Sequence, residues 1–296
     1  MSSSSPSEIE LRRRLFNVAP DLTLVGDEAG PASGEIVLLL HGGGQTRGAW
    51  RAVQVALAVR GIRSLALDQR GHGESSRADS YLLEHYADDL AAVVRAVGGR
   101  PALVGASLGG LASTLLLGER KGAGSALVLV DVTPSHAPSG ADKIREFMQA
   151  NPDGFASLNE AADAVAAYLP HRRRPKTYAG LEKNLTPSDD GRWHWRWDGR
   201  FLTGAPGEAF AYDAARVSRA LAAVEAPALL IRGGASEIVT EAEVAEAQAL
   251  LPSLHVATVP GAAHMVAGDD NDVFFQTIFD FLAPPRLGAQ ITESAR

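Results

Sequence analysis

Short runs of apolar residues recur along this chain, and each run stops at or near a glycine or an aspartate. The runs are rich in Val, Leu and Ile and do not alternate with polar residues, which is typical of strands buried on both faces of a parallel sheet. They cover residues 35–40, 62–67, 102–104, 126–130, 228–231 and 255–259. This pattern restricts the chain to folds that are built around a mostly parallel sheet.

Segments with the period of an α-helix lie between these runs. Apolar residues recur at 50, 53 and 57 in the segment 50–59, and at 86, 90, 93, 94 and 97 in the segment 86–97. Strands that alternate with helices predict an α/β fold with a doubly wound, mostly parallel sheet. A weaker strand at 22–25 is expected at the edge of this sheet.

The alternation of strands and helices breaks in the middle of the chain, where prolines are frequent. Because the pattern resumes at residue 216, we interpret residues 135–215 as a mostly helical cap inserted into a single core domain. The core then consists of residues 9–134 and 216–296. Residues 1–8, which are rich in serine, are expected to be a disordered tail.

Three tryptophans stand at alternate positions within the expected cap, as on one face of a strand. They are Trp193, Trp195 and Trp197. Two roles are open for them, packing inside the cap and forming a wall of the substrate pocket.

The charge balance and the missing residue types exclude several classes of protein. The chain has 28 Lys and Arg against 35 Asp and Glu, a formal net charge of −7, which disfavours a broad nucleic-acid-binding face. It has no cysteine, so disulfide frameworks, thiolate nucleophiles and Cys-ligated metal sites are excluded. No apolar stretch reaches the roughly 20 residues that span a bilayer. The N-terminal residues do not resemble a secretory signal, and we expect a cytoplasmic protein.

Two short basic runs stand out against this acidic background, at residues 12–14 and 171–174. Each is brief, and we expect solvated helix or loop surface at both places.

The strongest chemical signal is the pentapeptide Gly105-Ala106-Ser107-Leu108-Gly109, which follows an apolar run and opens a helical segment. A serine in this context is typical of a nucleophile elbow, in which a strained turn lifts the serine oxygen into the cleft beyond the strand ends. Only small residues fit at the two flanking glycines. The same turn directs the backbone N–H of Leu108 at the cleft. Ser107 is therefore the predicted nucleophile.

A second signal is the run His41-Gly42-Gly43-Gly44 directly after the apolar run 35–40. Glycines at the carboxyl end of a buried strand let the backbone approach a ligand and offer unhindered N–H donors. The run matches neither a phosphate-binding loop nor a dinucleotide fingerprint. We predict that the N–H of Gly43 is part of an oxyanion hole, with Gly42 and Gly44 beside it in the substrate site. His41 is expected to be structural.

Taken in chain order, these motifs resemble those of the α/β-hydrolase family. The glycine run is followed by Asp-Gln-Arg-Gly-His-Gly-Glu-Ser at 68–75, the Ser107 elbow, the cap, and Gly-Ala-Ala-His at 261–264. The resemblance covers nearly the whole chain outside the tail and the middle of the cap. It implies a triad in the order serine, acid, histidine, and hydrolysis through an acyl-enzyme. The segment 68–75 is assigned a structural role, shaping the pocket wall.

The resemblance implies that the general base lies on the loop after the last strand, where His264 stands. The seven other histidines fall elsewhere: His41 in the glycine run, His72 between glycines, His85 in a helix, His136, His171 and His194 in the cap, and His255 at the start of a strand.

The acid departs from the commonest pattern of the family. That pattern places an aspartate after the strand 228–231, and the matching position here is Ser236, whose hydroxyl cannot stabilise an imidazolium as a carboxylate does. Two carboxylates can replace it. Glu237 is the adjacent residue, whereas Asp131 closes an apolar run, and the segment 130–134 resembles small esterases whose acid has migrated to that strand. We favour Asp131, because a charge at the end of a buried strand needs a partner; its structural alternative is to cap the loop that follows.

The serine nucleophile narrows the reaction that the resemblance implies. Haloalkane dehalogenases and epoxide hydrolases of this fold carry an aspartate at the elbow, so Ser107 argues against both. We expect hydrolysis of carboxylic esters, with lactones and thioesters included, and no cofactor or metal. A C–C bond hydrolase and a non-catalytic small-ligand-binding protein of the same fold are the alternatives. The expected partner is a small-molecule ester, without nucleic acid or membrane, and the expected assembly is a monomer or homodimer.

Overall fold

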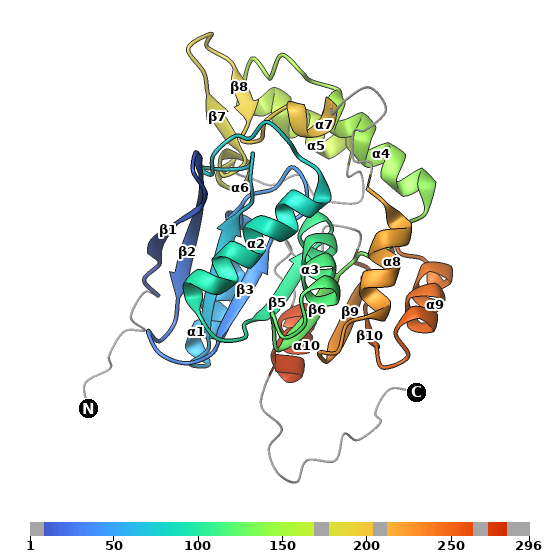
Figure 1. The fold of residues 1–296 in the computed structure, drawn as a ribbon. Coiled ribbons are helices and arrows are strands. Elements are labelled where there is room, and N and C mark those ends of the chain that lie inside the picture. The colour runs from blue at the N-terminus through green and yellow to red at the C-terminus, as the bar shows by residue number, and fades with distance from the viewer. Residues whose placement is uncertain (1–8, 169–177, 204–211, 263–271, 283–296) are drawn as a thin grey trace, which may run out of the picture.

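A mixed eight-stranded sheet forms the centre of the fold, with the strand order β1-β2-β4-β3-β5-β6-β9-β10 (Figure 1). The computed structural model describes residues 9–168, 178–203, 212–262 and 272–282. From β4 to β10 all neighbouring strands are parallel, whereas the β1–β2 and β2–β4 pairs are antiparallel. The strands are β1 (Arg12–Ala19), β2 (Leu22–Ala29), β3 (Ile36–Leu40), β4 (Arg63–Asp68), β5 (Ala102–Ala106), β6 (Ala126–Val130), β9 (Ala228–Gly233) and β10 (His255–Val259).

Helices cover both faces of this sheet, as the alternating pattern predicted (Figure 1). One face carries α2 (Leu83–Val97), α3 (Leu108–Glu119), α8 (Ala214–Ala222) and α9 (Glu241–Leu250). The other face carries α1 (Arg51–Val59), which follows the short 3-10 helix η1 (Arg47–Trp50), and α10 (Asp272–Leu282). The predicted fold class, an α/β fold with a doubly wound, mostly parallel sheet, is confirmed.

Burial on both faces explains why the strands read as unbroken apolar runs. In β3, Leu38 packs into the core on the α2–α3 side and Leu39 into the core on the α1–α10 side, and both are fully buried. Each such side chain stabilises the fold by about 1.5–3 kcal/mol relative to an exposed one. A polar residue at either position would lose this contribution, so no alternation is possible in these strands.

The edge of the sheet differs from the sequence prediction. The strand expected at the edge is longer, β2, and it lies one place inside, because β1 pairs with it from Arg12 to Ala19. The basic run at 12–14 is therefore strand and not helix or loop. Arg12 and Arg14 bind the carboxylate of Glu28, which is buried on β2 and also bound by Arg63. The second basic run, 171–174, lies outside the described residues.

A group of elements between β6 and α8 lies beyond the carboxyl ends of the parallel strands (Figure 1). We call these elements the cap. The bounds of the cap, residues 135–215, stay a prediction. The group has its own small core, in which Phe155 and Leu185 are fully buried. Its elements are α4 (Pro138–Gln149), α5 (Leu158–Tyr168), α6 (Ala179–Glu182), β7 (Leu185–Pro187), β8 (Trp193–Trp195) and α7 (Arg200–Thr203).

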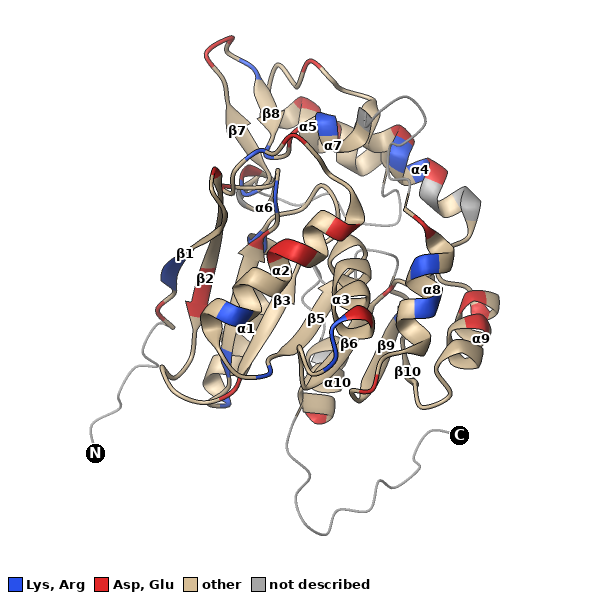
Figure 2. Cartoon of the chain, in the orientation of Figure 1, with Lys and Arg blue, Asp and Glu red and all other residues tan. Residues whose placement is uncertain are grey.

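Charged residues of both signs are distributed over the helices and the cap (Figure 2). Neighbouring helices can differ in sign: α8 carries Arg216 and Arg219, while α9 carries Glu241, Glu243 and Glu246. Among the described residues, no helix has the length and apolar character needed to cross a membrane.

Candidate active site

Ser107 stands at the sharp turn between β5 and α3, where the G-x-S-x-G pattern predicted a nucleophile elbow. Its backbone has φ 44° and ψ −114°, in the left-handed region that residues with a side chain seldom adopt. The turn is fixed because the N–H of Ser107 donates to the carbonyl of Val130 on β6, while its own carbonyl accepts from Gly110 and Leu111. The side chain is partly exposed. The strained turn thus presents the hydroxyl at the carboxyl end of the sheet.

The flanking glycines are required by close backbone packing. A Cβ on Gly105 would lie 2.4 Å from the carbonyl carbon of Gly109, and a Cβ on Gly109 would lie 2.6 Å from the carbonyl oxygen of Leu40. Both contacts are shorter than atoms tolerate, and both involve backbone that cannot turn away. Helix α3 can start directly after Ser107 because these two positions have no side chain.

The glycine run forms a loop, residues 41–44, that lies against Ser107. A Cβ on Gly42 would lie 3.3 Å from the Cβ of Ser107. The N–H of Gly42 donates to Gln45 Oε1 (2.9 Å) and that of Gly44 donates to His72 Nε2 (3.1 Å). In the described part of the chain, neither Gly43 nor Leu108 has a hydrogen-bond acceptor for its N–H. The two N–H groups predicted to form an oxyanion hole therefore have no acceptor among the described residues.

His41 and His72 support this loop from below as buried, neutral rings. His41 Nε2 accepts from the N–H of Gln69 (3.0 Å), and its Nδ1 lies 2.8 Å from the carbonyl of Gly42. The two rings are 5.0 Å apart. Burial, which disfavours the charged imidazolium, lowers the pKa of His41 to about 4 and that of His72 to about 3. The ring nitrogens of both histidines are engaged with backbone groups and not with Ser107. This agrees with the structural role expected for His41.

Asp131 follows β6 directly and its side chain is fully buried. Its φ of 49° is also in the left-handed region. One carboxylate oxygen accepts from the N–H of Gly233 (2.9 Å), and the other accepts from the hydroxyl of Ser236 (2.7 Å). Ser236, at the position where the family more often has its acid, thus supports the carboxylate of Asp131.

Glu237, the alternative acid, has a different environment. Its side chain is 62% exposed and pairs with Lys143 of α4 (2.6 Å). An exposed ion pair of this kind contributes little to stability and leaves the carboxylate in solvent. The geometry favours Asp131 over Glu237 as a buried, oriented carboxylate.

The predicted base, His264, lies outside the described residues. The chain that leads to it can be followed to Ala262, whose carbonyl accepts from the N–H of Ala235 (2.8 Å). Gly234, in the same loop, donates to the carbonyl of Val259 (2.8 Å). The segment before His264 is therefore attached to the loop that also binds Asp131.

The cap presents apolar groups to the glycine loop. A Cβ on Gly44 would lie 2.6 Å from Met148 Cε and 3.3 Å from Trp197 Cζ3. Trp197 stacks on Trp195 with 4.8 Å between the ring centres. No local sequence signal marks Met148, because a methionine on a cap helix does not reveal its position in space. Gln45, whose Oε1 accepts from Gly42, also has no such signal, because its role depends on a backbone contact.

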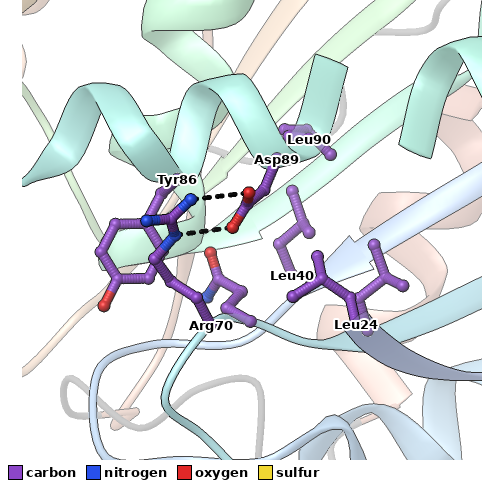
Figure 3. Close-up of a pocket in the computed structure, with 8 residues that line it drawn as sticks. Leu24, Leu40, Arg70, Tyr86, Asp89 and Leu90 are labelled. Atoms are coloured by element: carbon purple, nitrogen blue, oxygen red, sulfur yellow. Dashed lines mark hydrogen bonds and ion pairs between the residues drawn. The ribbon is translucent and has the colours of Figure 1, made fainter. Parts of the chain in front are cut away.

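A small pocket lies next to this site, and Ser107 does not line it (Figure 3). In it, the guanidinium of Arg70 faces the carboxylate of Asp89 on α2 and makes two hydrogen bonds of 2.7 Å. Burial raises the pKa of Asp89, although Arg70 opposes the shift. The Oη of Tyr86 is buried beside the pair, without a partner among the described residues. This ion pair attaches the loop after β4 to α2, and its role is structural.

Comparison with known proteins places the chain in a family. Residues 37–277 match the model of the group described as the alpha/beta hydrolase family. The chain is 35% identical over 218 residues to the esterase Rv0045c of Mycobacterium tuberculosis, which is 71% of this chain and 70% of that protein. A crystal structure of that esterase matches with a TM-score of 0.74 and 28% identity, covering 94% of this chain and 92% of that one.

The name of a second relative specifies a substrate, whereas that of the first gives only the class esterase. The chain is 28% identical over 257 residues to 2-(acetamidomethylene)succinate hydrolase of Mesorhizobium japonicum, covering 84% of this chain and 88% of that protein. The crystal structure of E-2-(acetamidomethylene)succinate hydrolase matches with a TM-score of 0.80 and 25% identity, over 92% of this chain and 99% of that one. The family match at residues 37–277 spans Ser107 and the predicted cap.

Proposed function

The chain belongs to the α/β-hydrolase family and is a hydrolase, and from this premise we propose that it cleaves carboxylic esters with Ser107 as the nucleophile. The observation that carries the proposal is the strained turn at Ser107, together with the N–H groups of Gly43 and Leu108, which have no acceptor among the described residues. A serine on a strained turn, with available N–H donors in the same turn and in the neighbouring loop, suits a reaction in which negative charge develops on a carbonyl oxygen.

The proposed mechanism assigns one role to each residue. The Oγ of Ser107 attacks the ester carbonyl carbon while its proton passes to His264. The N–H groups of Gly43 and Leu108 bind the oxyanion of the tetrahedral intermediate. When that intermediate collapses, the alcohol leaves with the proton from His264, and a water molecule repeats the sequence on the acyl-enzyme. Asp131 holds the imidazole in the tautomer that accepts the serine proton.

Asp131 is supported as the acid by its burial and by its attachments. Its carboxylate is held by Gly233 and Ser236, in the loop that binds the segment leading to His264. A carboxylate fixed in this way can orient a histidine without a large loss of conformational freedom.

The ester class is supported by two independent features. One relative with 35% identity is named an esterase. The other feature is the apolar surface of Met148 and Trp197 against the glycine loop, which suits an uncharged acyl group better than a carboxylate. We therefore include acyl esters, lactones and thioesters among the candidate substrates.

A second candidate is hydrolysis of a bond other than an ester, with the same nucleophile. The similarity to 2-(acetamidomethylene)succinate hydrolase favours it, because that match covers more of the chain than the esterase match. C–C bond hydrolysis is a related alternative. A non-catalytic binding protein of this fold would have no need for a strained serine at this turn.

A substrate panel tests the proposal. We expect turnover of p-nitrophenyl esters with a preferred acyl length, weaker turnover of lactones, and none of an acetamido-substituted dicarboxylate or a C–C substrate. Ser107→Ala should abolish turnover and leave the circular dichroism spectrum unchanged. An organophosphonate ester should label the wild type once, at Ser107. Labelling at another serine, or turnover of the dicarboxylate alone, would contradict the ester proposal.

A further inference from the structure

The N–H groups of the glycine loop, residues 41–44, differ in whether they have a hydrogen-bond acceptor. Gly42 and Gly44 each donate to a side chain, Gln45 and His72, whereas Gly43 between them has no acceptor among the described residues. Since the two neighbouring peptide groups are fixed, the direction of the N–H of Gly43 is fixed as well. The arrangement leaves one donor available and determines where it points.

The ring of His72 can accept this hydrogen bond in one tautomer only. Its Nδ1 lies 2.9 Å from the carbonyl of Arg70, which must accept a proton from it, so Nε2 carries the lone pair that faces Gly44. The ring is 99% buried, between the ring of His41 at 5.0 Å and the edge of Phe201 at 4.9 Å. Water has little access to Gly44 from this side, and His72 is its acceptor.

The backbone of His72 is also fixed, and the contacts come from the cap. The N–H of Gly73 donates to the carbonyl of Arg196 (2.7 Å), and the N–H of Asp198 donates to the carbonyl of Gly71 (2.8 Å). His72 and Trp197 form a β-bridge between these two bonds. The acceptor for Gly44 is therefore held from the core by Arg70 and from the cap by the segment 196–198.

We propose that His72 is a positioning residue for the reaction at Ser107: by accepting the N–H of Gly44 it fixes the glycine loop so that the N–H of Gly43 meets the oxyanion. The inference rests on the proposed function of that loop. Removal of the acceptor leaves the N–H of the half-buried Gly44 without its protein partner, and the loop is then no longer held in place. A displacement of about 1 Å at an oxyanion donor is enough to reduce catalysis by up to about 10²-fold.

Three variants separate positioning from packing. His72→Phe keeps a ring between His41 and Phe201 but has no acceptor. His72→Gln places an amide oxygen near the position of Nε2. His255→Phe is the matched control, because His255 is exposed on the edge strand β10. All three are compared with the wild type at equal folded fraction, determined by urea unfolding.

We expect His72→Phe to lower kcat by about 10- to 100-fold with KM changed by less than about threefold, since the ground-state substrate does not need the oxyanion donor. The rate constant for phosphonylation of Ser107 should fall in parallel, because the phosphonyl oxygen uses the same donor. His72→Gln should recover most of both losses, and His255→Phe should show neither. A purely structural role would lower stability and leave kcat per folded molecule unchanged, which would overturn the proposal.

Two readouts separate this inference from the ester proposal. The ¹⁵N spectrum of the His72 imidazole should show a proton on Nδ1 and none on Nε2 at pH 7, whatever the substrate is. If the wild type hydrolyses no ester but is phosphonylated in a way that depends on His72, the ester class is wrong and the positioning role stands. A proton on Nε2, or equal phosphonylation rates in wild type and His72→Phe, would refute the positioning role even if esters are substrates.

Discussion

Ser107 and Asp131 share a backbone conformation that costs free energy. Their φ angles are 44° and 49°, and every other positive φ among the described residues belongs to a glycine. Each such conformation costs about 1–3 kcal/mol, and strain of this kind is concentrated at functional sites. The two residues directly follow β5 and β6, which are neighbours in the sheet. Strain at both positions supports the proposed roles of Ser107 as nucleophile and Asp131 as acid, independently of any sequence resemblance.

The choice of acid gives a direct prediction. Asp131→Asn keeps the shape of the side chain but cannot hold the histidine in its tautomer, and in a related triad the equivalent change lowers turnover by about 10⁴-fold. Glu237→Gln removes an exposed carboxylate paired with Lys143 and should change kcat by less than about tenfold. Both are measured as kcat at saturating ester.

The two variants must be compared at matched folded fraction, because Asp131 is buried and binds Gly233 and Ser236. Ser236→Ala removes one of these bonds and serves as an intermediate case, with a smaller loss of kcat than Asp131→Asn. Several orders of magnitude lost in Glu237→Gln, with Asp131→Asn near wild type, would show that the acid lies after β9.

The sequence predicts the residues whose role depends on local structure. Ser107 and its glycines were identifiable because strand, turn and helix are consecutive, and Asp131 because it closes an apolar run. The sequence predicts no role for Gln45 and only a general structural role for His72, as part of the segment 68–75, because the contacts of both side chains depend on the backbone groups they meet. The contact of Ser236 with Asp131 joins residues 105 positions apart, and such contacts become visible only in the folded chain.

At the scale of elements, strand β1 shows where the sequence pattern misleads. The run 12–14 alternates between exposed and half-buried residues, and its charges indicate solvent. Two of these arginines nevertheless bind the buried Glu28 across the β1–β2 pair. The parallel strands were predicted correctly because burial on both faces leaves an unbroken apolar run. An edge strand that is held by ion pairs, as β1 is, has no unbroken apolar run by which the sequence could reveal it.

Glu28 makes the attachment of β1 dependent on pH. Burial raises the pKa of Glu28, but the bonds from Arg63 and Arg12 outweigh it and leave the pKa below the ordinary 4.5. The ion pairs therefore stabilise the fold at pH above 4.5, and this contribution is lost as the pH falls through the lower, folded-state value. Glu28→Gln should lower the free energy of unfolding at pH 7 by about 2 kcal/mol and accelerate amide exchange in β1.

The matched control for this prediction is Glu225→Gln. Glu225 pairs with Lys121, but both side chains are largely exposed, so the change should lower the free energy of unfolding much less than Glu28→Gln does. Equal losses in the two variants would mean that the buried cluster does not attach β1.

At the scale of the whole molecule, the two buried histidines couple folding to proton uptake. The folded-state pKa values of His41 and His72, about 4 and about 3, lie below the ordinary 6.5. Both rings are neutral in the folded protein at pH 6, whereas in the unfolded chain they are largely protonated below pH 6.5. Above pH 6.5 both histidines are neutral in the folded and in the unfolded chain, so they do not affect the free energy of unfolding. This free energy falls as the pH drops from 6.5 toward about 4 for His41 and about 3 for His72.

We expect the free energy of unfolding to fall by roughly 1 kcal/mol per histidine between pH 6 and pH 5. Urea titrations at pH 7, 6 and 5 measure this slope. His72→Phe should reduce the dependence of the unfolding free energy on pH by the contribution of one histidine. His255→Phe, at an exposed position, should leave this dependence unchanged. An unaltered slope in His72→Phe would mean that the ring is not kept neutral by the fold.

The β-bridge between His72 and Trp197 limits how freely the molecule can be recombined with its relatives. Gly71 and Gly73 exchange backbone bonds with Asp198 and Arg196, so the cap and the loop after β4 form one interface, although more than 100 residues separate them. Transplanting the cap alone would replace one side of this interface and leave the other unmatched. A functional chimaera would have to carry residues 69–75 together with the cap, because the two segments contact each other through these backbone bonds.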